Sequence, residues 1–141
     1  MKKTTNLVWG GRFEYDSSDI LKRINNSISF DYNLAHQDIK LNKQYAKSLF
    51  KAKILSVNEL KKINVALDDI HQEVKKKKFK FSDDYEDIHM NIEMALRKRV
   101  GRLAGKLHTG KSRNDQVATD VKLWTKEKIK NVIDKIKKIQ K

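Results

Sequence analysis

Residues 104–120 read AGKLHTGKSRNDQVATD, and this stretch decides how the rest of the chain is organised. Residues 101–111 contain three glycines, which predicts a loop. Ser112 follows directly, and Asp115 comes three residues later. Each of these side chains can accept a hydrogen bond from the backbone amide of the other, an arrangement called a capping box. The stretch therefore predicts a loop that ends where a long helix begins.

The helix that starts at this capping box is expected to run to the end of the chain. Apolar residues recur along it at helical spacing, which predicts one apolar face. No stop signal precedes Lys141, so we expect a missing continuation or a missing partner helix to cover this face. The face consists of Val117, Val121, Trp124, Ile129, Val132, Ile136 and Ile139.

Two earlier helices are predicted from the same kind of spacing. The first covers about residues 32–52, with Asp31 as its N-cap. The second begins at another capping box, formed by Ser56 and Glu59, and ends in the lysine run near residue 77.

A further helix is predicted at about residues 86–100, with a cap from residues 82–84 and a stop at Gly101. A short helix is expected at about residues 19–25 and a loop at residues 25–29. The sequence shows neither a strand pattern nor an internal repeat, so the expected fold class is all-α.

The composition excludes several classes of protein. The 141 residues contain no cysteine, which excludes disulfides, thiolate metal sites and a cysteine nucleophile, and is compatible with a reducing cytoplasm. We find no signal peptide and no stretch near the roughly 18–20 apolar residues of a membrane span. A cytoplasmic protein without a membrane partner is therefore expected.

The formal charge of +14 raises the alternative of a small basic helical module that binds nucleic acid or a partner helix. Most of the excess is lysine, concentrated at residues 75–78 and 126–141, and aromatic side chains that could stack on bases are not interleaved with it. We therefore favour a solvated lysine-rich surface and expect no nucleic-acid partner, although such a field would also steer an anionic substrate.

The stretch at 104–120 also presents polar side chains in a chemically useful place. Free backbone amides at a helix start favour binding of an anion. The guanidinium of Arg113 can donate two parallel hydrogen bonds to a carboxylate, and Asn114 and Thr109 can add further hydrogen bonds. This favours a carboxylate or phosphate cradle. The competing interpretation is that Ser112 and Asp115 only cap the helix while Arg113 is solvated.

Two histidines and an aspartate need the same comparison. His89 and His108 lack the spacing of metal ligands, so no metal is expected. Asp87 near a helix start is typical of a capping residue, but a carboxylate is also what would hold a guanidinium. Trp9 and Phe13 are interpreted as packing anchors.

Taken together, these segments resemble argininosuccinate lyase of the fumarase/aspartase superfamily, and the resemblance spans essentially the whole chain. The final segment is by far the most specific. The matching stretches are Trp9-Gly10-Gly11-Arg12-Phe13, Asn26-Ser27-Ile28, residues 86–93 (EDIHMNIE) and residues 104–120.

The resemblance implies the N-terminal helical domain of the fumarase/aspartase fold at 1–111, plus the start of the first central-bundle helix at 112–141. It implies a homotetramer that cleaves argininosuccinate to arginine and fumarate, the last step of arginine biosynthesis, without metal or organic cofactor. A base removes a proton from the succinyl carbon, and an acid protonates the departing guanidino nitrogen.

The resemblance also implies roles for individual residues. Ser27 and Asn114 would contact argininosuccinate, and Arg113, Ser112 and Thr109 would line the same carboxylate-binding segment. Asp87 and His89 would lie beside it, nearer the guanidinium end or in support of it.

The chain departs from the family in two respects. Lys111 stands where the family usually has arginine, so the positive charge is kept but the bidentate hydrogen bonding of a guanidinium is lost. The family's His-Thr-His-Leu-Gln segment and its Gly-Ser-Ser loop, which supplies the catalytic serine, are not among these residues. We therefore expect a partial lyase that binds substrate and is inactive alone.

Overall fold

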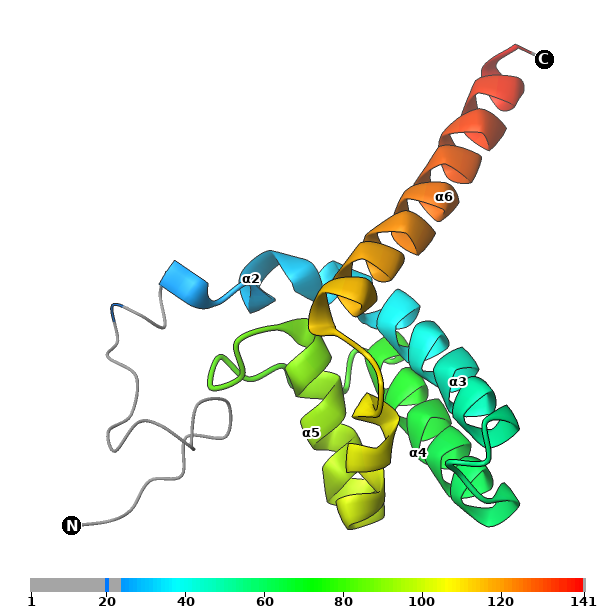
Figure 1. The fold of residues 1–141 in the computed structure, drawn as a ribbon. Coiled ribbons are helices and arrows are strands. Elements are labelled where there is room, and N and C mark those ends of the chain that lie inside the picture. Colours follow the sequence, from blue (N-terminus) through cyan, green and yellow to red (C-terminus); the bar gives the residue numbers. More distant parts are fainter. Residues whose placement is uncertain (1–19, 21–23, 141) are drawn as a thin grey trace.

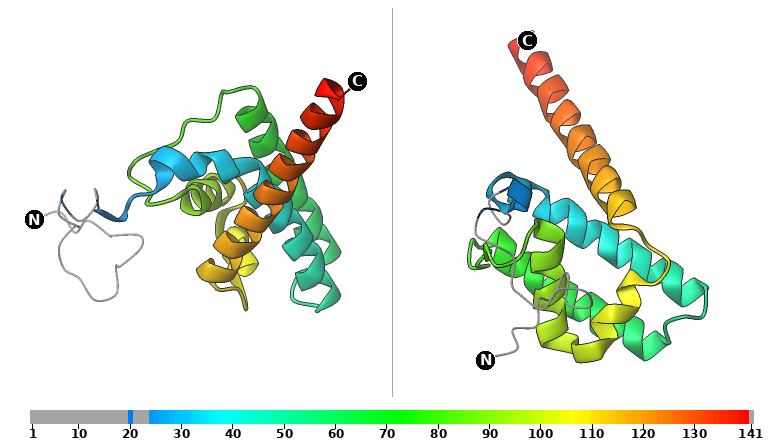
Figure 2. Two further views of the ribbon diagram at one scale, coloured as in Figure 1. Left: turned by 90° about the horizontal axis from the view of Figure 1, so that it is seen from above. Right: turned by 60° about the vertical axis from the view of Figure 1, so that its left-hand side comes forward.

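A computed structural model describes residue 20 and residues 24–140, and in that part of the chain all regular secondary structure is helical (Figure 1). The all-α expectation is therefore confirmed. Helices α3, α4 and α5 pack together, and α6 projects away from them (Figures 1 and 2). In chain order the elements are α2 (Ile28–Asp31), the 3-10 helix η1 (Tyr32–Leu34), α3 (Ala35–Lys51), α4 (Val57–Lys75), α5 (Ile88–Val100), the 3-10 helix η2 (Gly101–His108) and α6 (Arg113–Ile139).

The hydrophobic core lies between α3, α4 and α5, because each of these helices turns its apolar face toward the others. Apolar residues at steps of three and four become almost inaccessible to solvent there, as the spacing predicted. A fully buried side chain of this size contributes about 1.5–3 kcal/mol through the hydrophobic effect. The most deeply buried apolar side chains are Ile39, Ile63, Leu67, Ile70, Ile88, Ile92 and Leu96.

Both predicted capping boxes are present. Ser56 and Glu59 exchange hydrogen bonds at the start of α4, and Ser112 and Asp115 do so at the start of α6. Gly101 ends α5 with a positive φ of 61°, which favours glycine, so the predicted stop is also confirmed.

The predicted boundary around Asp31 is wrong. The loop expected at 25–29 gives way to α2 from Ile28, and the side chain of Asp31 makes no capping hydrogen bond to the helical turn that follows it. Its carboxylate instead accepts hydrogen bonds from Ser27 Oγ at 2.6 Å and from the Ile88 amide at 3.2 Å. A partner distant in sequence, the start of α5, therefore replaces the local cap.

Two further expectations near α5 are wrong. The helix begins at Ile88 rather than about 86, and its N-cap is Asp87, whose carboxylate accepts from the Met90 amide at 2.6 Å, not a residue of 82–84. Most of the loop predicted at 101–111 is the 3-10 helix η2. Its turns bury Ala104 and Leu107 against the core, and this burial outweighs the local preference of glycine for irregular backbone.

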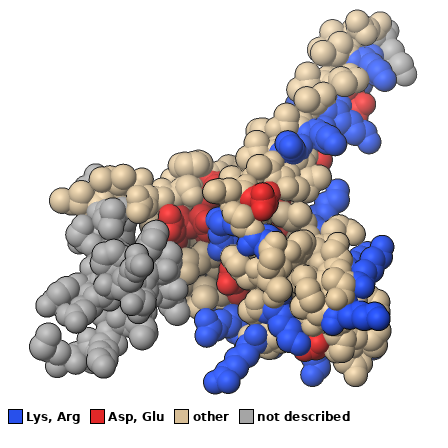
Figure 3. All heavy atoms as spheres, viewed as in Figure 1, with Lys and Arg blue, Asp and Glu red and all other residues tan. Residues whose placement is uncertain are grey.

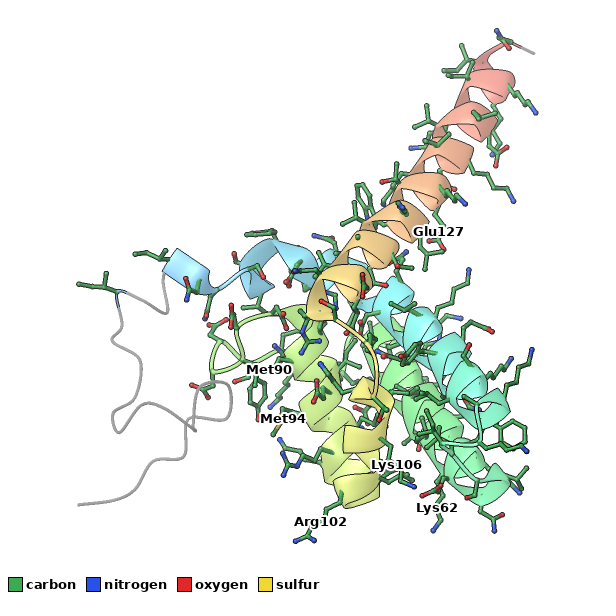
Figure 4. The ribbon with its side chains drawn as sticks, in the orientation of Figure 1. Lys62, Met90, Met94, Arg102, Lys106 and Glu127 are labelled. Atoms are coloured by element: carbon green, nitrogen blue, oxygen red, sulfur yellow. The ribbon has the colours of Figure 1, made fainter. Side chains whose placement is uncertain are left out.

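Helix α6 is joined to the core only through its first turns. Of its 27 residues, Gln116 and Asp120 alone are buried, and residues 125–140 are all exposed. The predicted apolar face is present, but solvent covers its distal part. The Glu127 side chain accepts a hydrogen bond from Gln37 of α3 at 2.8 Å, near the point where α6 leaves the other helices (Figure 4).

Some expectations fall outside the described residues. These are the packing roles of Trp9 and Phe13 and most of the short helix at 19–25. Within the described part, no helix combines the length and hydropathy that crossing a bilayer requires.

Replacing Leu67 with alanine tests the assignment of the core. Leu67 is fully buried in α4, so Leu67→Ala should lower the free energy of unfolding by about 2–5 kcal/mol, measured by chemical denaturation. The control is Val65→Ala in the same helix, where the valine is 55% exposed, and its effect should stay within about 0.5 kcal/mol. Equal effects of the two changes would contradict this core.

Candidate functional site

A cleft of about 390 Å³ lies where α2, η1 and the start of α5 meet the first turns of α6. It brings together three of the residues singled out from the sequence, Ser27, Asp87 and His89. The wall contributed by α6 is apolar, and the opposite wall mixes polar side chains with Phe30 and Leu34. The complete lining is Ser27, Phe30, Asp31, Asn33, Leu34, Asp87, His89, Val117, Val121 and Trp124.

Ser27 is held in the cleft by contacts on both sides. Its backbone amide donates to the Glu86 carbonyl at 2.9 Å, which ties α2 to the segment before α5. Its hydroxyl donates to Asp31, whose carboxylate also accepts from the first amide of α5. Ser27 and Asp31 therefore form one hydrogen-bonded pair at the N-terminus of α5.

Asp87 caps α5, as one of the two interpretations of the sequence expected, and it also lies near a guanidinium of the same chain. Its carboxylate caps α5, and its Oδ2 lies 3.7 Å from Nε of Arg113. The same guanidinium approaches Glu93 Oε2 at 3.2 Å and donates to Gln116 Oε1 at 3.0 Å. Arg113 is thus half-buried among acceptors rather than solvated, and its fork bridges α5 and α6.

The remaining predicted residues lie outside the cleft lining. Ser112 and Asn114 are exposed, and the Ser112 hydroxyl accepts from the Asn114 amide at 3.3 Å. Thr109 is also exposed, and its carbonyl accepts from the Tyr45 hydroxyl at 2.7 Å. Side chains at the start of α6 therefore accept hydrogen bonds from some of the backbone amides that were expected to face an anion.

Acidic side chains gather on the face of the molecule where α2, α5 and the start of α6 meet, whereas lysine and arginine side chains are scattered over the other helices and along α6 in that view (Figure 3). Burial and the neighbouring Asp87 raise the pKa of Glu86 at this place. A strongly basic chain thus carries a local acidic patch beside its cleft, which suits a ligand with both a cationic and an anionic end.

Behind the cleft lies a buried polar cluster that sequence reasoning missed. Nδ1 of His89 lies 2.9 Å from Oδ1 of Asp38 on α3 and 3.4 Å from Oδ2 of Asp120 on α6. Both carboxyl groups are fully inaccessible to solvent, and the imidazole is 2% exposed. The cluster therefore joins α3, α5 and α6 through one imidazole ring.

The Asp38 carboxylate accepts several hydrogen bonds. Gln116 Nε2 donates to its Oδ1, and Asn42 Nδ2 donates to its Oδ2 at 2.9 Å. Lys111 donates to Asn42 Oδ1 at 2.8 Å and so brings a cation to the edge of the cluster. Burial lowers the pKa of Lys111, while the charge of Asp38 opposes this shift.

Asp120 is the unusual member of the cluster. Burial raises the pKa of its carboxyl group to about 9, and the charge of Asp38 acts in the same direction. Two adjacent carboxyl groups without solvent cannot both ionise easily, so one of them keeps its proton at neutral pH. We assign that proton to Asp120, because Asp38 is occupied in accepting hydrogen bonds.

The cluster also contains three donor atoms of the kind that hold metal ions. One atom each from Asp38, His89 and Asp120 all lie within 4.8 Å of one another. Spacing along the chain does not predict this group, because its members lie on three helices. The available signal was a pair of polar residues, Asp38 and Asn42, one turn apart beside the apolar face of α3.

Comparison with known proteins identifies the class of protein to which this fold and site belong. A family model described as Lyase matches residues 11–141, and the chain belongs to this lyase family. Argininosuccinate lyases are among its relatives. That of Ehrlichia ruminantium (strain Welgevonden) is 48% identical over 136 residues, or 96% of this chain. That of Ehrlichia canis (strain Jake) is 52% identical over 124 residues, or 88% of the chain. That of Limosilactobacillus reuteri is 44% identical over 133 residues, or 94% of the chain.

The matches cover nearly all of this chain but only part of each relative. The chain spans 29%, 26% and 29% of the length of these three relatives. The expected resemblance to argininosuccinate lyase is thus confirmed for this region of the family.

Replacing Asp120 with asparagine tests the protonated carboxyl group. The folded pKa of about 9 exceeds the ordinary value of 3.8, so folding takes up a proton between these pH values and wild-type stability falls as pH rises through them. Asp120→Asn cannot ionise and should become progressively more stable than wild type across that window, as measured by thermal unfolding. Asp134→Asn, at an exposed position of the same helix, is the control. A constant difference at all pH values would contradict the assignment.

Proposed function

We propose that this chain carries the substrate-binding N-terminal segment of an argininosuccinate lyase. The observation that carries the proposal is the convergence of Ser27, Asp87 and His89 on one cleft, with Arg113 paired to Asp87 at its edge. These residues come from three separate parts of the sequence. Their convergence in a chain related to named argininosuccinate lyases favours a common ligand over unrelated structural roles.

The chemistry of argininosuccinate fits the charges of this region. The substrate has a guanidinium group at the arginine end and two carboxylates on the succinyl end. The carboxylates of Asp31 and Asp87 suit the guanidinium, whereas the Arg113 fork suits a carboxylate. Ser27 adds a hydroxyl that can donate to the substrate once it rotates away from Asp31. Asn114 and Thr109 remain proposed contacts for a ligand that extends over the start of α6.

The reaction proposed for the whole enzyme is an elimination. A base takes the proton from the succinyl carbon, the carbon–nitrogen bond breaks as the double bond of fumarate forms, and an acid protonates the departing guanidino nitrogen. By the resemblance, the catalytic serine belongs to a loop that is not among these residues. The role proposed for this segment is binding and orientation, without metal or organic cofactor.

The proposed homotetramer has support in α6. Its apolar side chains Ile129, Val132, Ile133 and Ile136 are each 45–54% exposed along a helix that leaves the other described elements. An apolar face of this length is typical of a helix that packs in a bundle.

The first test of the proposal is turnover. The 141 residues mixed with argininosuccinate should give no sustained fumarate, measured by ultraviolet absorbance, because removing a catalytic group costs several orders of magnitude in rate. A full-length argininosuccinate lyase is the positive control. Steady fumarate production by the purified chain would show that the base lies among these residues.

The second test is binding, measured by calorimetric titration with argininosuccinate. Arg113→Lys keeps the charge but loses the fork, so affinity should fall about tenfold, in the range of one charge-assisted hydrogen bond of roughly 1.5–3 kcal/mol. Arg102→Lys is the matched control, because Arg102 is exposed at the far end of the molecule from the cleft (Figure 4). Equal affinity of the two variants would count against the proposed site.

A further inference from the structure

His89 occupies a position between the cleft and the buried cluster behind it. Its imidazole belongs to the cleft lining together with Ser27 and Asp87. Its Nδ1 contacts Asp38 at 2.9 Å and Asp120 at 3.4 Å, which leaves Nε2 as the ring nitrogen without a carboxylate neighbour among these contacts. The two ring nitrogens of a histidine differ in function according to which of them carries the proton. The contacts at Nδ1 therefore decide whether Nε2 of His89 can accept a hydrogen bond from a ligand.

The environment of Asp38 requires a carboxylate rather than a carboxylic acid. Its Oδ1 accepts from the Gln116 amide, and its Oδ2 accepts from the Asn42 amide. An ionised carboxylate has acceptor sites only, so the third neighbour, His89 Nδ1, must also supply a hydrogen. Nδ1 therefore carries a proton.

Asp120 reinforces this arrangement from the other side. Its two oxygens are buried and accept no hydrogen bond from the described residues. As a neutral acid beside Asp38, Asp120 adds no second negative charge, so the charged carboxylate that accepts from His89 is Asp38 alone.

The same contacts argue against a metal ion as the natural occupant. Hydrogens of Gln116, Asn42 and His89 already point at Asp38, so a cation would have to displace donors that are built into three elements. The Lys111 ammonium, which is hydrogen-bonded to Asn42, adds a positive charge to the same neighbourhood. A cation there would meet repulsion in a region that is already compensated.

We propose that Asp38, backed by Asp120, is a positioning residue that keeps the proton of His89 on Nδ1 and so reserves Nε2 for a ligand in the cleft. The arrangement follows the logic of an aspartate that fixes the tautomer and orientation of a histidine and stabilises its imidazolium form. The identity of the ligand, argininosuccinate, rests on the proposed function. The tautomer itself does not depend on any ligand.

The proposal has a pH signature. The groups that face Asp120 are Asp38 from α3, His89 from α5, and Lys111 from the segment before α6. When Asp120 loses its proton, a second negative charge appears beside the His89 ring. The nitrogen signals of the ring should shift at the pH where Asp120 ionises.

Nitrogen-15 NMR of the histidine side chains in the 141-residue chain tests the proposal directly. His89 signals are identified by their loss in His89→Asn. The expected neutral ring has a pyrrole-type Nδ1 and a pyridine-type Nε2, with a further shift at the pH where Asp120 ionises. The opposite tautomer, with the proton on Nε2, would overturn the proposal. So would stoichiometric binding of Zn²⁺ that abolishes the Nδ1 proton signal.

Two isosteric variants separate positioning from folding. Asp38→Asn removes the charge that holds Nδ1–H and should lose the single-tautomer pattern, whereas Asp134→Asn should keep it. Asp120→Asn should keep the tautomer at neutral pH and lose only the high-pH shift. If Asp38→Asn does not fold, the tautomer of His89 in the wild type and its comparison with Asp120→Asn still test the proposal. An intact tautomer in a chain that fails to bind argininosuccinate would refute the proposed function and leave the positioning role standing.

Discussion

The buried carboxylate of Asp38 is the constraint on which the arrangement of the helices depends. It lies on α3 and accepts hydrogen bonds from His89 of α5 and Gln116 of α6, in addition to Asn42 of its own helix. A buried charge is costly unless each of its acceptor sites is used, so helices that move relative to one another lose this compensation. Apolar packing brings α3, α4 and α5 together, but it is non-directional. The hydrogen bonds of the Asp38 carboxylate are directional, and they fix the position of α6 against α3 and α5.

Much of the architecture could be predicted because it depends on local chemistry. Capping boxes, apolar spacing and the positive φ of Gly101 are properties of a few neighbouring residues, and each led to an element close to the observed one. The errors occurred where a distant partner overrides the local preference. Asp31 serves the start of α5 instead of its own helix, and burial of Leu107 folds an apparent loop into 3-10 turns.

The candidate site divides in the same way. Asp87 and Arg113 could be predicted because charged side chains at helix starts are chemically conspicuous, whereas Ser27 is implied only by the family resemblance. Asp38 and Asp120 were not noticed, since an aspartate inside an amphipathic helix is usually solvated. Only the packing of α3, α5 and α6 shows that these two carboxyl groups meet in the interior. Buried polar residues behind such a cleft can therefore be found only from the three-dimensional structure.

The unequal attachment of α6 has a consequence for hydrogen exchange along a single helix. The first turns are tied down by Gln116 and Asp120, whereas the turns beyond Glu127 have only their own backbone bonds and solvated side chains. Helical segments shorter than about 12–15 residues are marginal in water without tertiary support. Amide protons in the proximal turns should therefore exchange with the global opening of the domain, and those in the distal turns by fraying. One continuous helix would then contain two thermodynamic regimes, with the transition between them near Glu127.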